Sequence, residues 1–225
     1  MPSPSTTVAP PTDPDAVPRI DALALRAGLE RCGRVVARHA SMLTRLDTVL
    51  GDGDHGDNLV IGFRAVDELL AELPAETPPG DLLRAVGHRL VAAVGGASGP
   101  LYGTACIEAG FVAGGRPSLD GPTMAAMFRA AADGLARRGR SQPGDKTILD
   151  TLSPTAAAFQ AAIDAGAGVD VAWAAACQAG AGGMRSTRDL LARRGLAMRL
   201  GDRSVGHLDP GAVSCLLLLI ALGGR

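Results

Sequence analysis

Aromatic residues are scarce in this sequence, and neither positive nor negative charge is in excess. Aromatics make up only 3% of the 225 residues, although hydrophobic residues as a whole make up 47%. Small aliphatic side chains with few β-branched runs favour closely packed helices over sheets. The formal net charge of −1 provides no net basic surface for a nucleic-acid backbone, so we expect no nucleic-acid partner.

Cysteines and long apolar runs are also few. The four cysteines, Cys32, Cys106, Cys177 and Cys215, lie far apart without a CxxC pair, which favours reduced structural thiols over disulfides or a zinc site. The N-terminus has no apolar segment typical of a signal peptide. The longest apolar run, residues 212–222, is too short to span a bilayer. We therefore expect a soluble, cytoplasmic protein without a membrane partner.

The length is sufficient for one domain with a substantial core. Residues 1–18 are rich in Pro, Ser and Thr and lack hydrophobic periodicity, which predicts a disordered tail before a single domain over residues 19–225. Apolar spacing predicts about eight helices and no convincing strand. Residues 20–50 form one helix or two, and further helices begin near residues 58, 82, 101, 123, 154, 169 and 211, the one from 169 reaching about 194.

Short connections between these helices favour antiparallel neighbours, so the expected architecture is an all-α up-and-down bundle or barrel. The turns marked by glycine, aspartate or proline would then gather at one end.

The most informative segment is LDTVLGDGDHGDN, residues 46–58. It places Asp47, Asp52 and Asp54 close together, and clustered carboxylates repel one another unless a cation neutralises them. Oxygen ligands suit Mg²⁺, which takes further ligands from water and phosphate. The alternative for a lone DGD is a surface turn. An EF-hand fails because Phe63, not glutamate, stands at its twelfth position.

Two adjoining features favour phosphate. His55, Gly56, Asp57 and Asn58 lie at a predicted helix N-terminus, where free N–H groups and the helix dipole attract anions. The glycine-rich segment GGASGPLYGT, residues 95–104, also opens a predicted helix, and its glycines let the backbone approach an anion. It is not a P-loop, because no Lys-Ser/Thr pair ends it, and taken alone it is equally typical of a tight helix connection.

Together with GDKTILDTLSP (residues 144–154) and GDRSVGHLDPGAVS (residues 201–214), these segments resemble the nucleotide-binding L subunit of dihydroxyacetone kinases. The four motifs occur in that family's order and approximate spacing, over about residues 20–225. The resemblance implies an eight-helix antiparallel barrel that binds ADP or ATP at one end beneath two Mg²⁺ ions.

The resemblance also assigns site residues by position. It assigns the Mg²⁺ ions to Asp47, Asp52 and Asp54. The positions that it places against the nucleotide are His55, Gly56, Asp57, Asn58, Ala97, Ser98, Gly139, Ile148, Asp209, Pro210 and Gly211. Beyond this metal–nucleotide site, no catalytic residue is expected in the chain itself.

The family's partners follow from the same resemblance. A separate K subunit binds dihydroxyacetone covalently through its own histidine, and the L subunit presents the phosphoryl donor. Some systems exchange ATP, and others keep ADP bound and recharge it from a phosphotransferase-system protein. Some L subunits contact a transcriptional regulator. Dihydroxyacetone is the expected ketose, and a four-carbon ketose such as erythrulose stays open.

One position departs from the family pattern. Many relatives carry an arginine that contacts the nucleotide phosphates where this chain has Leu196, with Arg194 and Arg199 nearby. Loss of such a charge-assisted contact typically costs about 1.5–3 kcal/mol. The departure leaves a nucleotide-sensing regulatory subunit as the alternative function. A fatty-acid-kinase-type protein is a weaker alternative, because those chains continue with further domains and this one ends at Arg225.

Overall fold

The computed structural model describes residues 19–224, and the predicted tail over residues 1–18 lies outside the described residues. Within them the chain is mostly helical with almost no strand, which confirms the all-α prediction. The α-helices are α1 (Ala22–Leu50), α2 (His55–Glu72), α3 (Pro79–Ala93), α4 (Ser98–Ala113), α5 (Gly121–Gly139), α6 (Leu149–Asp164), α7 (Val169–Ser186) and α8 (Pro210–Leu222). A 3-10 helix, η1 (Leu196–Ser204), precedes α8.

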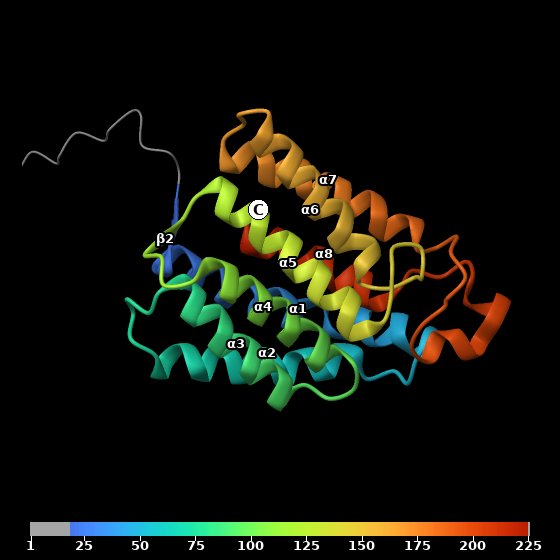
Figure 1. Cartoon of the computed structure of the whole chain (residues 1–225). Coiled ribbons are helices and arrows are strands. Elements are labelled where there is room, and N and C mark those ends of the chain that lie inside the picture. Colours follow the sequence, from blue (N-terminus) through green and yellow to red (C-terminus); the bar gives the residue numbers. More distant parts are fainter. Residues whose placement is uncertain (1–18, 225) are drawn as a thin grey trace, which may run out of the picture.

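The eight α-helices form a closed antiparallel barrel. Each helix packs against the next one in the chain, and α8 packs against α1 to close the ring (Figure 1). Two short strands, β1 (Ile20–Asp21) and β2 (Ser118–Leu119), pair antiparallel and lie at the left-hand end in that view. The long connections before α6 and α8 lie at the right-hand end.

Aspartates begin three of the helices. Asp21 accepts a hydrogen bond from Ala24 N at the start of α1, and Asp120 accepts one from Thr123 N at the start of α5. Asp209 does the same for α8. Such N-caps satisfy backbone donors that have no partner inside the helix.

The barrel interior is apolar. Leucine, valine and alanine side chains from all eight helices bury against one another, and they leave an internal cavity of about 310 Å³. Phe128, Phe159 and Trp173 form a cluster between α5, α6 and α7, with ring centroids 5.1 to 6.1 Å apart. No helix of the described residues has the length and apolar character needed to cross a membrane.

Several helix limits differ from the sequence prediction. The two short strands were not expected. Helices α2 and α4 begin three residues earlier than predicted, at His55 and Ser98. Helix α6 begins at Leu149 and contains Pro154, which the prediction had placed at its start. The carbonyl that Pro154 leaves without a helical partner, Asp150 O, faces Gly183, where a Cβ would lie 1.8 Å away.

The prediction that α7 reaches residue 194 was wrong. The helix ends at Ser186, and residues 187–190 continue in tighter turns, in which each N–H donates to the carbonyl three residues earlier. Thr187 O accepts a hydrogen bond from Lys146, and Arg193 N donates to Asp145 O at 3.1 Å. These two tertiary bonds tie the chain beyond the helix to the connection before α6.

Candidate metal and nucleotide site

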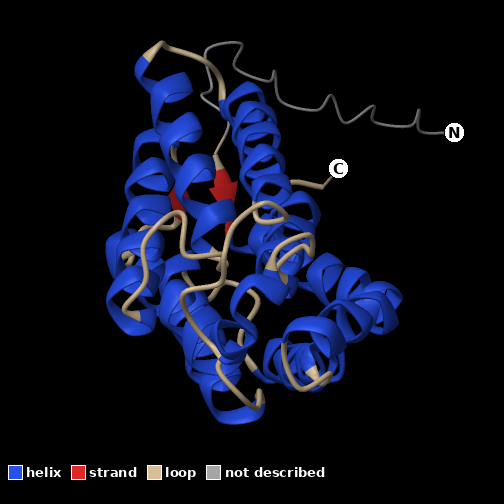
Figure 2. Cartoon of the chain, turned by 90° about the vertical axis from the view of Figure 1, so that its right-hand side faces the viewer, coloured by secondary structure: helices blue, strands red, loops and turns tan. Residues whose placement is uncertain are grey.

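The four motifs meet at one end of the barrel. Because successive helices alternate in direction, α1, α3, α5 and α7 end there, and α2, α4, α6 and α8 begin there. Figure 2 looks onto this end, across which the connecting loops run. The expectation that these turns gather is therefore confirmed, and residues far apart in the sequence come into contact.

A cluster of three carboxylates lies at this end. One ligand oxygen from each of Asp47, Asp52 and Asp54 lies within 4.8 Å of the others, the only such group of metal-ligating side chains found in residues 19–224. Asp47 is buried, whereas Asp52 and Asp54 are exposed. Asp47 Oδ2 accepts hydrogen bonds from Gly53 N at 3.0 Å, Asp54 N at 3.0 Å and His55 N at 3.2 Å. Asp47 thereby fixes the turn that presents the other two carboxylates.

The cluster fits a divalent cation. Asp54 stands at the N-cap position of α2 but makes no capping hydrogen bond, so its carboxylate is not used to stabilise the helix. Three carboxylates brought this close are stabilised by a hard cation, and their oxygens are the ligands that Mg²⁺ prefers. A bound ion would neutralise phosphate oxygens beside it.

Next to the carboxylates, His55 connects three helices. Its Nδ1 lies 3.0 Å from Ser98 Oγ in α4, and its Nε2 lies 2.8 Å from Ser214 Oγ in α8. Tyr102 OH lies 2.6 Å from the same Ser214 Oγ. Burial lowers the pKa of His55, an effect opposed by the nearby Asp47 and Asp54 carboxylates. The imidazole therefore serves as a buried junction between α2, α4 and α8.

These contacts bring three helix N-termini together. His55 and Ser98 are the first residues of α2 and α4, and Ser214 lies in the first turns of α8. The N–H groups at helix N-termini and the positive ends of the helix dipoles attract anions. This end of the barrel therefore combines carboxylates for a cation with backbone donors for phosphate.

The remaining predicted nucleotide residues lie around this centre. Asn58 approaches the glycine-rich loop, since a Cβ on Gly95 would lie 3.0 Å from its Oδ1. Gly211 lies beside Ile148, whose Cβ would be 3.7 Å from a Cβ there. Asp209 caps α8 by accepting Ala212 N at 2.7 Å.

Three predicted residues have weaker structural support. Asp57 and Ala97 are exposed, in the first turn of α2 and at the N-cap of α4. Gly139 ends α5, and a Cβ there would lie 3.5 Å from Leu101 of α4. The structure thus places Gly139 at this end of the barrel but does not join it to the carboxylates.

Sequence reasoning missed several polar residues that organise the loops. Asp150 accepts hydrogen bonds from Gly144 N at 2.6 Å and Thr147 N at 2.7 Å, which holds the connection before α6. Ser214 and Tyr102 were missed although both lie inside the quoted motifs. Lys146 was missed as well, although one signal was available: it is the only lysine in the sequence.

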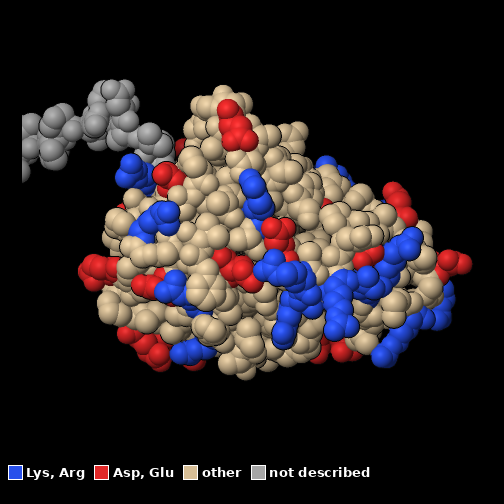
Figure 3. Space-filling model, viewed as in Figure 1, with Lys and Arg blue, Asp and Glu red and all other residues tan. Residues whose placement is uncertain are grey.

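Leu196 lies on the surface between two arginines. Leu196 begins η1, and its side chain is 41% exposed. Arg194 Nε lies 3.2 Å from the buried Asp145 Oδ2, so this guanidinium is engaged by the connection before α6. Arg199 is exposed. Basic side chains gather toward the loop-bearing end on the face shown in Figure 3, interspersed with acidic ones.

Comparisons with known proteins identify the family of this chain. A family model described as the DAK2 domain matches residues 49–223. The PEP-dependent dihydroxyacetone kinase, ADP-binding subunit DhaL, of Escherichia coli K12 is 40% identical over 191 residues, which cover 85% of this chain and 90% of that protein. The corresponding subunit of the Listeria innocua kinase 2 is 38% identical and covers 85% of this chain and 88% of its own.

A solved structure shows the same fold. The dihydroxyacetone kinase from C. freundii in complex with AMP-PNP and Mg²⁺ superposes with a TM-score of 0.67 at 24% identity. The match covers 99% of this chain but only 38% of that longer one.

Proposed function

Because this chain belongs to the DAK2 domain family, we propose that it is the nucleotide-binding subunit of a dihydroxyacetone-type kinase. It binds ADP or ATP with two Mg²⁺ ions and donates a phosphoryl group to a small ketose that a separate K subunit holds. The observation that carries this proposal is the cluster of Asp47, Asp52 and Asp54 beside three converging helix N-termini. The relatives named as ADP-binding subunits support it.

The chain's own residues hold and orient the donor. Asp47, Asp52 and Asp54 hold Mg²⁺, which when bound neutralises the phosphate oxygens. The N-termini of α2 and α4, with Ser98, receive the phosphates, and Ile148 with residues 209–211 covers the nucleoside side. His55 keeps these helices in register through Ser98 and Ser214. This division agrees with phosphoryl transfer in general, where positioning and electrostatics supply most of the catalysis.

The partners follow from the same family. The phosphoryl donor is ATP or, through bound ADP, a phosphoprotein, and the acceptor is dihydroxyacetone or a related ketose bound to the K subunit. The names of two relatives specify a PEP-dependent kinase of which they form one subunit. We place the protein in the cytoplasm, where such a phosphoryl donor is available.

Calorimetric titration with nucleotide tests the proposal. We expect tight binding of ADP in the presence of Mg²⁺ and weak binding in EDTA. Asp52→Asn should weaken Mg·ADP binding at least tenfold while the helical circular dichroism stays unchanged, because Asp52 is exposed and forms no hydrogen bond or ion pair within residues 19–224. The exposed Asp164→Asn, at the far end of α6, is the matched control. Wild-type protein that binds no Mg·ADP contradicts the proposal.

Leu196 favours a second candidate function. This exposed leucine side chain has no group that could donate a hydrogen bond to a phosphate. The neighbouring Arg194 forms an ion pair with Asp145. A weakened nucleotide site suits a subunit that senses ADP and reports to a transcriptional regulator. Addition of a cognate K subunit, Mg·ATP and dihydroxyacetone separates the two functions: phosphorylated ketose supports the kinase subunit, whereas nucleotide binding without turnover supports the sensor.

A further inference from the structure

Lys146 is exceptional in composition, burial and backbone conformation. Of the 22 Lys and Arg residues, it alone is lysine. Its side chain is the largest among those that are fully buried, with 1% exposure. Its φ of +60° lies in the left-handed region, which only one other described non-glycine residue, Arg140, also occupies. A charged residue kept in a buried and strained position, in a chain that otherwise uses arginine, indicates a specific requirement for a compact ammonium group.

The contacts of Lys146 show what the ammonium group does. Its Nζ donates hydrogen bonds to Thr187 O and His207 O, at the two ends of the segment that carries η1. Thr187 Oγ1 in turn accepts a hydrogen bond from Asp209 N at 3.1 Å. One side chain therefore ties the connection before α6 to both ends of the long connection before α8.

The charges around Lys146 favour its protonated form. Burial lowers the pKa of Lys146, and the side chains of Asp209, Asp150 and Asp189 oppose that shift when they are ionised. Both hydrogen-bond partners are carbonyl oxygens, which accept only. The ammonium group thus bonds two backbone carbonyls and lies near the side chains of Asp209, Asp150 and Asp189. The planar guanidinium of arginine is larger than an ammonium group, so at this fully buried position it would displace the surrounding backbone.

We propose that Lys146 is a positioning residue for nucleotide binding, which sets the segment 205–211 and the N-terminus of α8 against the bound nucleoside diphosphate. This inference rests on the proposed function. The mechanical connection is continuous: Lys146 fixes His207 and, through Thr187, Asp209, and α8 begins at the next residue. Ser214 of α8 then bonds His55 at the phosphate-facing turn.

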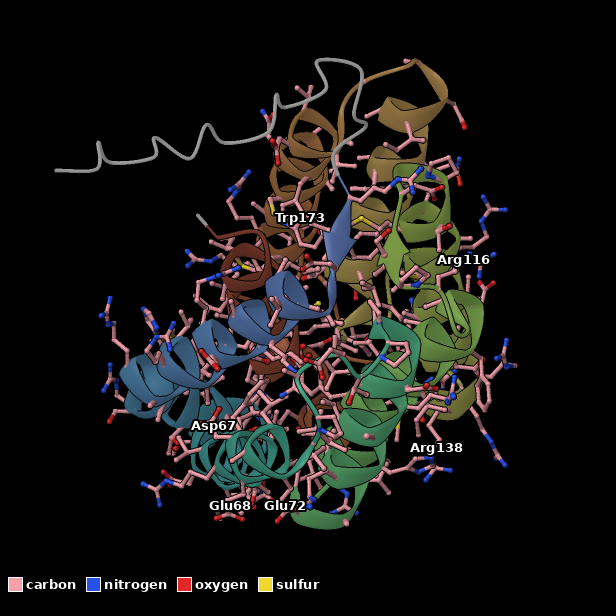
Figure 4. The ribbon with its side chains drawn as sticks, turned by 90° about the vertical axis from the view of Figure 1, so that its left-hand side faces the viewer. Asp67, Glu68, Glu72, Arg116, Arg138 and Trp173 are labelled. Atoms are coloured by element: carbon pink, nitrogen blue, oxygen red, sulfur yellow. The ribbon has the colours of Figure 1, made fainter. Side chains whose placement is uncertain are left out.

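Two variants and a control test this role by calorimetry. Lys146→Met keeps the length of the stem without the charge, and Lys146→Arg keeps the charge without the shape. Both should weaken Mg·ADP binding at least tenfold at a temperature where the protein is fully folded. Trp173→Phe is the control, since it removes the bond from Nε1 to Leu219 O near the other end of α8. Trp173 lies at the end of the barrel that faces the viewer in Figure 4, opposite the site.

The control separates positioning from stability. We expect Trp173→Phe to lower the melting temperature and leave the Kd for Mg·ADP within twofold of wild type. Wild-type affinity in folded Lys146→Met overturns the role of Lys146 and leaves the proposed function intact. A wild-type protein that does not bind Mg·ADP at all contradicts the proposed function itself, and this inference with it.

A measurement on the unaltered protein covers the case in which the Lys146 variants do not fold. Because the chain has a single lysine, its acetylation by an amine-reactive reagent is followed directly by mass spectrometry against a lysine-containing reference peptide. If the hydrogen bonds of Lys146 strengthen nucleotide binding, bound nucleotide must stabilise those hydrogen bonds by the same free energy. Saturating Mg·ADP should slow acetylation at least fivefold, and ADP with EDTA should not. An unchanged rate with Mg·ADP bound overturns the inference.

Discussion

Asp47 occupies its place only because residue 51 has no side chain. A Cβ on Gly51 would lie 2.2 Å from Asp47 Oδ1. We predict that Gly51→Ala displaces this carboxylate, together with the turn that its other oxygen holds, and weakens Mg·ADP binding at least tenfold in calorimetry. The cost in unfolding free energy should be about 1–3 kcal/mol, as for other overpacked sites.

Gly168→Ala is the matched control for this change. Gly168 also stands at a helix boundary, its φ is −64°, and no atom lies within 4 Å of the position that a Cβ would take there. It belongs to the connection between α6 and α7, at the opposite end of the barrel. Equal Mg·ADP affinity in the two alanine variants would show that the turn tolerates a side chain, contrary to the prediction.

Asp209 should make stability depend on pH. Burial raises its pKa from 3.8 to about 7, with Asp150 as a further cause and the Ala212 hydrogen bond opposing. The folded protein therefore keeps this proton up to about pH 7, whereas the unfolded chain releases it near pH 3.8. The contribution of protonated Asp209 to the free energy of unfolding is fully present below about pH 4 and is lost as the pH rises through 7.

Asp209→Asn removes that titration, because asparagine still caps a helix but cannot ionise. In urea unfolding with EDTA, the free energy of unfolding of the variant should rise by about 1–2 kcal/mol relative to wild type between pH 4.5 and pH 8. The expected difference is reduced by solvent screening, because the Asp209 side chain is only partly buried. A constant difference across this range would assign Asp209 an ordinary pKa.

The sequence predicted the residues of the acidic cluster better than it predicted the buried polar residues that surround the cluster. Asp47, Asp52 and Asp54 were recognisable because their spacing is local. Ser214 and His55 are 159 residues apart, and their contact exists only once α2 and α8 both pack against α1. No local pattern reports such a contact, so the buried polar residues around the site were missed.

Among the helices, α3 and α4 contact each other backbone to backbone. A Cβ on Gly87 would lie 2.6 Å from Gly103 O, and one on Gly103 would lie 2.6 Å from Gly87 O. Gly80, seven residues before Gly87, and Gly110, seven residues after Gly103, repeat this close approach. A Cβ on Gly110 would lie 2.7 Å from Gly80 O. The paired glycines fix the distance between these two helices, and α4 supplies the N-terminus that carries Ser98.

We predict that Gly87→Ala forces α3 and α4 apart and lowers the unfolding free energy by about 1–3 kcal/mol. Gly182→Ala in α7 is the control, since no atom would lie within 4 Å of its Cβ. An alanine in such an open helical position should stabilise by about 0.5–1 kcal/mol. Chemical denaturation of both variants measures the difference, and a Gly87→Ala protein as stable as wild type would rule out the tight contact.

Helix existence was predictable from periodicity, but helix ends were not. The eight α-helices follow from apolar spacing. The start of α2 at His55 depends on Asp47, which accepts its N–H from another element. The chain that leaves α7 is held by Lys146, which donates to Thr187 O. Limits set by tertiary hydrogen bonds carry no local sequence signal.

Closure of the barrel joins the two ends of the described chain. Arg31 in α1 donates to Ala221 O at 2.8 Å and Leu222 O at 2.9 Å at the end of α8. These partners are about 190 residues apart, so short loops alone could not distinguish a closed barrel from an open bundle. The family resemblance supplied that distinction, and the structure confirms it.

Because the four connections at one end of the barrel form the proposed site, nucleotide binding should stabilise the protein as a unit. A ligand that binds only the folded state at 100 times its Kd stabilises it by about 2.7 kcal/mol. For a domain of this size we expect Mg·ADP at that excess to raise the melting temperature by about 5–10 °C. The same ADP concentration with EDTA should shift it by much less, because the carboxylates then hold no cation that joins them to phosphate. Scanning calorimetry should also show one transition in both conditions, and a shift with EDTA as large as with Mg²⁺ would remove Asp47, Asp52 and Asp54 from the binding site.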